Sequence, residues 1–230
     1  MRGTRKKTVT PEQQILGHIT KTIGGNPANW DQLTTYGWQG ELEAAFLDSV
    51  LSVQAQYGNS ELTGVRLRVR HWRDKRAQLG GVDVVLDDLS ELAIFDTQPG
   101  TLAKILDNHQ TLSGRSRQRP LKALAVAQAA RLFANTGILH SAQITGNLAE
   151  KKLWCSVSGL GPTTWHYVLM LIGKPDVKAD TMITRFVSNA LGHTPQNAAV
   201  RTLIIGAATS IGVSATNLDY AIWSWQRRQR

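Results

Sequence analysis

Apolar residues recur every three or four positions along most of the chain, which is the spacing of one face of a helix. In the segment 41–54 this face carries Leu42, Phe46 and Val50. The segment 120–135 starts with a proline and stops before Gly137, as helices commonly do. The same pattern predicts further helices over 99–107, 147–157, 163–172, 181–191, 196–211 and 218–226.

The rest of the pattern gives little indication of a sheet. Only residues 82–86 have a strand-like composition, and a segment this short cannot organise a sheet. The sequence contains no internal repeat and no low-complexity linker that would separate domains. The pattern therefore predicts an all-α fold.

Charge and composition narrow the class of protein. The 230 residues include 26 Lys and Arg against 17 Asp and Glu, a formal net charge of +9, and 42% are hydrophobic. So many apolar residues can bury a core, which excludes a disordered basic tail. The longest nearly apolar run, 203–213, is shorter than the ~20 residues of a membrane helix, and residues 1–12 lack the apolar stretch of a secretory signal. We expect a cytoplasmic protein without a membrane partner, whose positive charge contacts nucleic acid.

The cysteine and histidine content argues against a metal centre. Cys155 is the single cysteine, so a disulfide framework and a four-thiolate zinc or iron–sulfur site within one chain are excluded. No two of the six histidines lie three or four residues apart. We therefore expect neither a metal nor an organic cofactor.

The most informative segment is 153–173. A predicted helix runs into Gly159-Leu160-Gly161, and the next begins at Pro162, a residue favoured at the first helical position. Two glycines around an aliphatic residue let the backbone approach another molecule closely, and the N–H groups there and at the new helix start can bind a DNA phosphate. Alternatively, Gly-Leu-Gly only joins two packed helices.

Two other segments are informative because of their positions before and after this hairpin in the sequence. Asp180, followed by Thr181, lies 180 − 161 = 19 residues after Gly161, where local sequence alone favours a helix N-cap. Upstream, the segment 50–56 reads Val-Leu-Ser-Val-Gln-Ala-Gln and includes Gln54. From about residue 41 to the C-terminus, these landmarks resemble the helix-hairpin-helix DNA glycosylase superfamily (HhH-GPD, endonuclease III-like proteins).

The resemblance implies a two-lobed fold and a set of roles. Residues 41–173 would form a helical barrel domain with the hairpin, and 1–40 plus 174–230 a second helical domain, with a cleft between them. Asp180 would both cap its helix and act as the catalytic carboxylate, stabilising the positive charge that develops on the deoxyribose. Gln54 would fill the gap left by a flipped base. DNA contacts are expected from Gly159, Leu160, Gly161, Thr163 and Thr164.

Three departures from the family pattern limit what is carried over. Bifunctional members have a lysine where this chain has Thr163, so no Schiff base can form by the usual route and a monofunctional enzyme is expected. Met182 stands where many relatives have histidine, which leaves the substrate branch open. The four-cysteine iron–sulfur loop of some members is absent.

Further candidates come from aromatic and basic residues. Tyr57, Trp38, Trp165 and His166 are candidate walls of a base pocket, although each is also typical of ordinary core or surface. One basic block spans 66–76, and a second contains Arg115, Arg117, Arg119 and Lys122. Either block can neutralise phosphates or form a solvated face, and we favour Arg115, Arg117 and Arg119 as DNA contacts.

Together these features predict a DNA glycosylase of base excision repair. The enzyme is expected to be a monomer, associated with the nucleoid through DNA, that hydrolyses the N-glycosidic bond of a damaged or mismatched base in duplex DNA. The base itself is not specified by the sequence. Two alternatives are a non-catalytic helix-hairpin-helix DNA-binding protein and an RNA-binding helical module.

Overall fold

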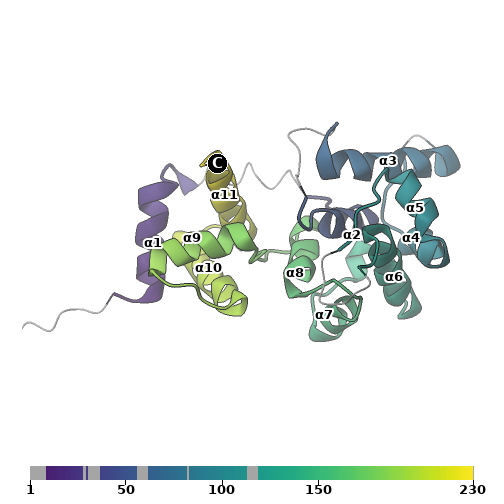
Figure 1. Ribbon diagram of the computed structural model, residues 1–230. Helices are drawn as coiled ribbons and strands as arrows, with labels where there is room; N and C mark the ends of the chain where they lie inside the picture. The colour runs from purple at the N-terminus through teal and green to yellow at the C-terminus, as the bar shows by residue number, and fades with distance from the viewer. Residues whose placement is uncertain are drawn as a thin grey trace, which may run out of the picture. The chain divides into compact units, whose positions relative to one another are not determined.

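The computed structural model describes residues 9–27, 30, 37–55, 62–81, 83–112 and 119–229. The chain divides into two compact units, one of Gly37–Lys174 and the other of Met1–Tyr36 with Pro175–Arg230 (Figure 1). The expected division, 41–173 against the two flanking segments, differs from these limits by four residues at one end and one at the other. Each unit has a hydrophobic core of its own.

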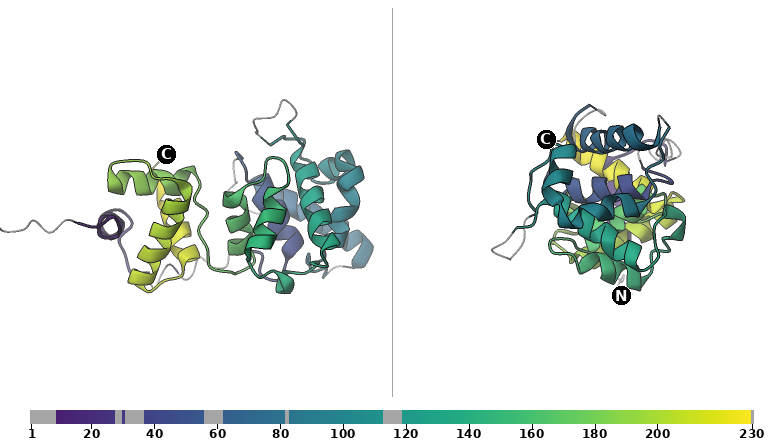
Figure 2. Two further views of the ribbon diagram at one scale, coloured as in Figure 1. Left: turned by 90° about the horizontal axis from the view of Figure 1, so that it is seen from below. Right: turned by 90° about the vertical axis from the view of Figure 1, so that its right-hand side faces the viewer.

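The unit of Gly37–Lys174 is built around one buried helix. All residues of α2 (Leu42–Leu51) are buried, and in Figure 2 this dark blue helix lies among the teal and green helices of its unit. The ring of Phe46 meets Phe133 and Trp154 edge-on at centroid distances of 5.3 and 4.9 Å. The surrounding elements are α3 (Gly64–Gly80), α4 (Leu89–Ala93), η2 (Ile94–Thr97), α5 (Pro99–Ile105), α6 (Lys122–Asn135), η3 (Ser141–Gln143), α7 (Leu148–Cys155) and α8 (Pro162–Leu171).

The other unit packs four helices around a smaller core. These are α1 (Pro11–Thr22), α9 (Thr181–Leu191), α10 (Asn197–Ile211) and α11 (Ala215–Arg228), and α1 and α11 each contact both α9 and α10. The core contains the fully buried side chains of Ile183, Phe186, Ile204 and Leu218. Helix α1 starts with a capping box at Thr10, which explains why a short N-terminal helix forms there.

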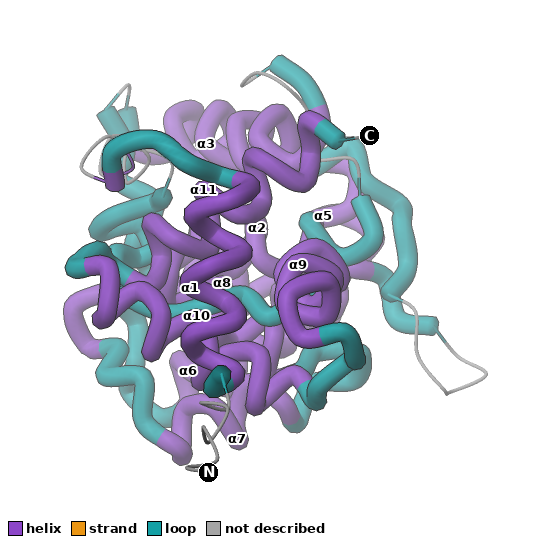
Figure 3. The backbone as a smooth tube through the Cα atoms, turned by 90° about the vertical axis from the view of Figure 1, so that its left-hand side faces the viewer, coloured by secondary structure: helices purple, strands orange, loops and turns teal. Residues whose placement is uncertain are grey.

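The all-α fold class is confirmed for the described residues, which contain helices, turns and one isolated bridge (Figure 3). The helix expected over 181–191 has those bounds, and most others differ by one to three residues at an end. Helix α11 starts at Ala215, three residues before its expected start, because Ser214 caps it by accepting the Asn217 N–H at 3.1 Å. The sequence did not single out α1, α3 or α4.

The strand-like segment contains no strand among residues 83–86. Its backbone groups instead bond to the start of α2 and to side chains near it. The N–H of Glu43 donates to Leu86 O at 3.0 Å, and the Arg73 guanidinium donates to Val84 O at 3.2 Å. An extended segment with β-branched residues therefore runs as a loop, because helices supply its hydrogen-bond partners.

Within the described residues, no single helix has the length and apolar character needed to cross a membrane, whereas α10 and α11, bent by 106° at their break, meet the criterion only as a pair.

Candidate functional site

The hairpin between α7 and α8 uses its two glycines differently. Gly159 has φ +85°, and a Cβ there would lie 2.9 Å from the side chain of Leu112, so both conformation and packing require glycine. Gly161 has φ −150°, which other residues can adopt, and nothing lies within 4 Å of an added Cβ. The fold therefore does not explain glycine at 161, whereas close approach of a ligand to this backbone would.

Some N–H groups of the hairpin are engaged within the protein. Leu160 N–H donates to Val157 O at 3.1 Å, and Gly161 N–H donates to Thr164 Oγ1 at 3.2 Å. The expectation that these two groups are free for an anion is therefore wrong. Within the described part of the chain, the N–H groups of Thr163 and Thr164 have no acceptor. They lie in the first turn of α8, so the anion-binding potential moves from the hairpin to the helix start.

Three predicted site residues prove to be structural supports of the hairpin. Leu160 is 8% exposed and packs in the core, and Trp165 is 1% exposed. Thr164 is buried, and its hydroxyl accepts from Trp154 Nε1 and donates to Gly161 O, both at 2.8 Å. These positions correct the expectations of a DNA-contacting Leu160 side chain, a DNA-contacting Thr164 hydroxyl and a base pocket lined by Trp165.

Gln54 lies on the surface just after α2 with a left-handed backbone, φ +51°. A glutamine adopts this conformation at a cost, and such strained residues concentrate at functional sites. Gln54 borders a cavity of about 300 Å³ that is also lined by Leu51, Ala55, Arg68, Asn108 and Gln110. Gly64 and Val65 also line this cavity, so the surroundings of Gln54 combine polar and apolar residues.

A buried lysine joins the end of α2 to Gln110. Lys122 is 2% exposed, and its Nζ donates to Leu51 O at 2.9 Å and to Gln110 Oε1 at 2.8 Å. Burial lowers the pKa of Lys122 to about 8. Lys122 is therefore a structural residue, which corrects its interpretation as part of a phosphate-binding block.

The loop before α6 is closed at its base by an isolated antiparallel bridge between Thr111 and Leu121. Arg119 is exposed on this loop. Two of the arginines favoured as DNA contacts, Arg115 and Arg117, and the pocket candidate Tyr57 lie outside the described residues.

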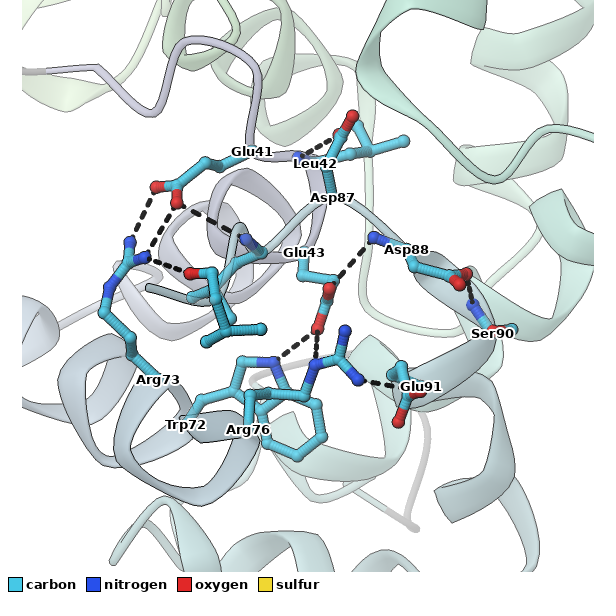
Figure 4. A network of polar contacts seen from close by, with 12 residues as sticks. Glu41, Leu42, Glu43, Trp72, Arg73, Arg76, Asp87, Asp88, Ser90 and Glu91 are labelled. Carbon is cyan, nitrogen blue, oxygen red and sulfur yellow. Dashed lines mark hydrogen bonds and ion pairs between the residues drawn. The ribbon is translucent and has the colours of Figure 1, made fainter. Parts of the chain in front are cut away.

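Three arginines of α3 pair with acidic residues of their own unit, and Figure 4 shows two of them, Arg73 and Arg76. Arg73 Nη2 lies 2.6 Å from Glu41 Oε2, and Arg76 bridges Glu43 and Glu91 at 3.4 and 2.7 Å. On the same helix, Arg68 pairs with Asp107, and Arg66 lies over the Trp38 ring at 5.3 Å. Arg68, Arg73 and Arg76 therefore help to hold the unit together, whereas Arg70 of the same block is exposed.

Glu43 is the buried centre of this network. It is 0% exposed and accepts from Trp72 Nε1 at 2.6 Å and from Asp88 N–H at 2.9 Å. Burial raises the pKa of Glu43 to about 7, an effect that these two donors and the charge of Arg76 partly offset. Neighbouring carboxylates continue the network in Figure 4 by accepting backbone N–H groups.

The two remaining pocket candidates are tied to their own unit. Trp38 is half-buried, and its Nε1 donates to Asp48 Oδ2 at 2.8 Å. His166 is half-buried on α8, where its Nε2 lies 3.2 Å from Lys151 Nζ. No pocket wall is formed by either residue in the described cavity.

Asp180 occupies the N-cap of α9 in the other unit. Its Oδ1 accepts the N–H groups of Met182 at 2.8 Å and Ile183 at 3.2 Å. Oδ2 has no hydrogen-bond partner among the residues that the structure describes, and the side chain is half-exposed. The cap therefore fixes the carboxylate through one oxygen and leaves the other available to a ligand.

The segment leading to Asp180 is fixed along its length. Asp176 N–H donates to Thr216 Oγ1 at 3.1 Å, and Arg201 Nε donates to Asp176 Oδ1 at 2.6 Å. Lys178 N–H donates to Asp219 Oδ2 at 2.9 Å. Val177 and Ala179 are buried in the core of this unit, and the Asp180 N–H donates to Lys178 O at 2.6 Å, so the backbone turns just before α9.

Asp219 is the functional candidate that sequence reasoning missed. It is 5% exposed on α11, and burial, followed by the charge of Asp180, raises its pKa well above its usual value. Asp219 lies 219 − 180 = 39 residues after Asp180, so no local spacing connects the two. Only the packing of α11 beside the 176–180 segment brings these carboxyl groups together.

The described residues contain no group of three or more His, Cys, Asp or Glu side chains arranged to hold a metal ion. A family model described as Domain of unknown function (DUF8548) matches residues 14–227 of the chain. No curated protein and no solved structure matches the chain.

Proposed function

The chain belongs to the DUF8548 family, and we propose that it is a monofunctional DNA glycosylase that hydrolyses the N-glycosidic bond of a damaged or mismatched base in duplex DNA. The family description names no activity, so the proposal depends on the residues of this chain. It combines two kinds of support. The order of the motifs resembles that of the helix-hairpin-helix DNA glycosylases, and the geometry of Asp180 and of the start of α8 suits the reaction.

The observation that carries the proposal is the divided use of the Asp180 carboxylate. Oδ1 is held by two N–H groups at the start of α9, whereas Oδ2 has no described partner. A preorganised carboxylate that needs no reorientation is suited to stabilise a cation formed during a reaction. An N-cap alone would be served equally well by serine or asparagine.

The reaction needs little else from the protein. Breaking the bond between C1′ and the base leaves positive charge on the sugar, which a nearby carboxylate stabilises. The oxygen of a water molecule then bonds to C1′, and a proton of that water ends on the departing base. With Thr163 in place of an amine, the proposed enzyme forms no Schiff base and leaves an abasic site with intact strands.

DNA binding is assigned to the unit of Gly37–Lys174. The N–H groups of Thr163 and Thr164 would donate to the oxygens of a phosphate, and the open surface at Gly161 would let that phosphate approach. Arg119 adds positive charge from an exposed loop. Gln54, strained and exposed at the end of α2, would fill the gap left by a flipped base.

The test is incubation with a panel of duplexes that each contain one alkylated, deaminated, oxidised or mismatched base, followed by alkali to cleave abasic sites. We expect alkali-dependent cleavage at one class of lesion and no borohydride-trapped adduct. Binding to the duplexes without base release from any of them would favour the non-catalytic DNA-binding alternative. A trapped adduct at any lysine would contradict the monofunctional mechanism.

A further inference from the structure

We propose that Asp219 is a positioning residue for Asp180, because it holds the 176–180 segment by accepting the Lys178 N–H and thereby fixes the Asp180 carboxylate. The consequence for reaction rate depends on the proposed glycosylase function. The structural consequence does not, since it concerns only how the segment is held.

The geometry of α11 supports this role. Thr216 and Asp219 are three residues apart, which places them on the same face of the helix. Thr216 holds Asp176, and Asp219 holds Lys178, two residues before Asp180. The first turns of α11 therefore clamp the segment at two alternate residues, and the cap of α9 fixes its end.

The electrostatic environment sets Asp219 apart from an ordinary anchor. Among the described residues, the charged groups that face it are Asp180, Asp176 and Lys178, and Arg201 is paired with Asp176. Burial and the two like charges raise the pKa of Asp219, so it keeps its proton to a higher pH than an exposed aspartate. A neutral acceptor such as serine or asparagine would hold Lys178 without this cost. Titratable groups kept in such surroundings are typical of functional sites.

Two substitutions separate the hydrogen bond from the acid. Asp219→Ala removes the acceptor for Lys178 N–H. Asp219→Asn retains an acceptor oxygen of the same shape but has no titratable proton. Asp87→Ala is the matched control, because Asp87 also accepts backbone N–H groups, from Leu42 at 2.9 Å and Ser141 at 2.8 Å, but belongs to the other unit.

The first readout is amide hydrogen exchange in the whole protein, without DNA. Asp219→Ala should increase the exchange rates of Lys178, Met182 and Ile183 at least about tenfold, since each loses a fixed partner or a fixed cap. Asp219→Asn should restore slow exchange, and Asp87→Ala should leave these three amides unchanged. Unchanged exchange in Asp219→Ala would overturn the proposal, whether or not the protein is an enzyme.

The second readout is the single-turnover rate of base release on the lesion identified by the duplex panel. Asp219→Ala should lower it about 10- to 100-fold at nearly constant DNA affinity, the effect of a misplaced reacting group. Asp219→Asn should stay near the wild-type rate at a pH where Asp219 is protonated. It should also lack the change in rate that the wild type shows when rising pH removes the proton of Asp219.

The two readouts distinguish the possible failures. A wild type inactive on every lesion overturns the glycosylase proposal, while the exchange data still decide whether Asp219 orders the segment. If Asp219→Ala releases the base at the wild-type rate, or loses activity only in proportion to the unfolded fraction measured by circular dichroism, Asp219 does not position the reaction. If Asp219→Ala does not fold, exchange in Asp219→Asn and the dependence of its rate on pH decide. A pH–rate profile identical to that of the wild type overturns the role of the acid.

Discussion

The two units place their buried carboxyl groups in opposite electrostatic surroundings. In the unit of Gly37–Lys174, Glu41 and Glu43 face arginines of α3, so opposite charges lie together. In the other unit, Asp219 faces Asp180 and Asp176, with Lys178 as a nearby cation and Arg201 paired with Asp176. The first arrangement neutralises charge within the fold, whereas the second concentrates negative charge at the start of α9.

This difference indicates which carboxylates serve stability and which serve chemistry. An acid that faces donors and cations on all sides holds elements together, and its removal leaves buried partners unpaired. Acids that face one another cost stability, and such groups are typical of functional sites. The comparison therefore predicts that substitutions in the first unit change folding and that substitutions at Asp180 change the reaction.

The largest effect is expected from Asp180→Asn. Asparagine can still cap α9 through its side-chain oxygen, so folding and DNA affinity should be retained. The substitution removes the charge that stabilises the sugar cation, which typically costs about 10²–10³ in rate. Single-turnover base release and DNA binding measured on the same lesion duplex test this division. Base release at the wild-type rate would remove Asp180 from the mechanism.

In the unit of Gly37–Lys174, the corresponding substitution is Glu43→Ala, which should change stability instead of reaction rate. This change leaves Trp72 Nε1, Asp88 N–H and Arg76 without their buried partner, and breaking such a pair typically costs about 3–5 kcal/mol. Urea unfolding followed by circular dichroism should show the loss. A change below about 1 kcal/mol would mean that the network of Figure 4 contributes little, and the contrast between the units would fail.

The free energy of unfolding should depend on pH through two buried residues of this unit, Glu43 and Lys122. The pKa of Glu43 is raised from 4.5 to about 7, so the folded state binds more protons over this range and the free energy of unfolding falls as pH rises through it. The pKa of Lys122 is lowered from 10.5 to about 8, so the unfolded state binds more protons between those values and stability rises again there. Each pKa unit corresponds to about 1.4 kcal/mol.

These two residues therefore predict a stability minimum near pH 7–8 in the unit of Gly37–Lys174. Unfolding measured from pH 5 to 10 tests it. In a plot of the free energy of unfolding against pH, Glu43→Gln should reduce the fall below about pH 7. Lys122→Met should reduce the rise above about pH 8. If either variant has the wild-type profile, the corresponding residue does not titrate as described.

How far the sequence predicts the molecule depends on whether a feature is local. Helical periodicity located α9, and the order of glycines and proline located the hairpin, because both are encoded within a few residues. The sequence suggested free arginines on α3, but their acidic partners come from distant segments, as with Arg73 and Glu41. Asp219 was missed for the same reason.

A smaller effect is expected from Gly161→Ala, which tests binding apart from chemistry. The added Cβ meets nothing within 4 Å, so the fold should be unchanged, but a methyl group would stand where a phosphate approaches. DNA affinity should fall about tenfold, roughly the loss of one charge-assisted hydrogen bond. The rate of base release from bound DNA should be nearly constant. Gly100→Ala is the control, since its added Cβ is equally free of contacts.

Gly159→Ala should instead destabilise the fold. Gly159 has φ +85°, and the added Cβ would lie 2.9 Å from the side chain of Leu112. If Gly161→Ala binds DNA as the wild type does, the hairpin only connects two helices. Calorimetric unfolding of both variants separates loss of fold from loss of binding.

The smallest change in stability is expected from Asp107→Asn, which breaks the most exposed pair of α3. The side chain of Asp107 is 69% exposed and that of Arg68 is 26% exposed, so the pair should contribute only about 0.2–1 kcal/mol. Arg68 lines the cavity beside Gln54, and removal of its partner frees a cation at that surface. DNA affinity should therefore rise, and the dependence of log K on log salt should steepen by about one unit. An unchanged salt slope would show that Arg68 does not contact DNA even when it is unpaired, so that its role is structural, like that of Arg73 and Arg76 in the buried network.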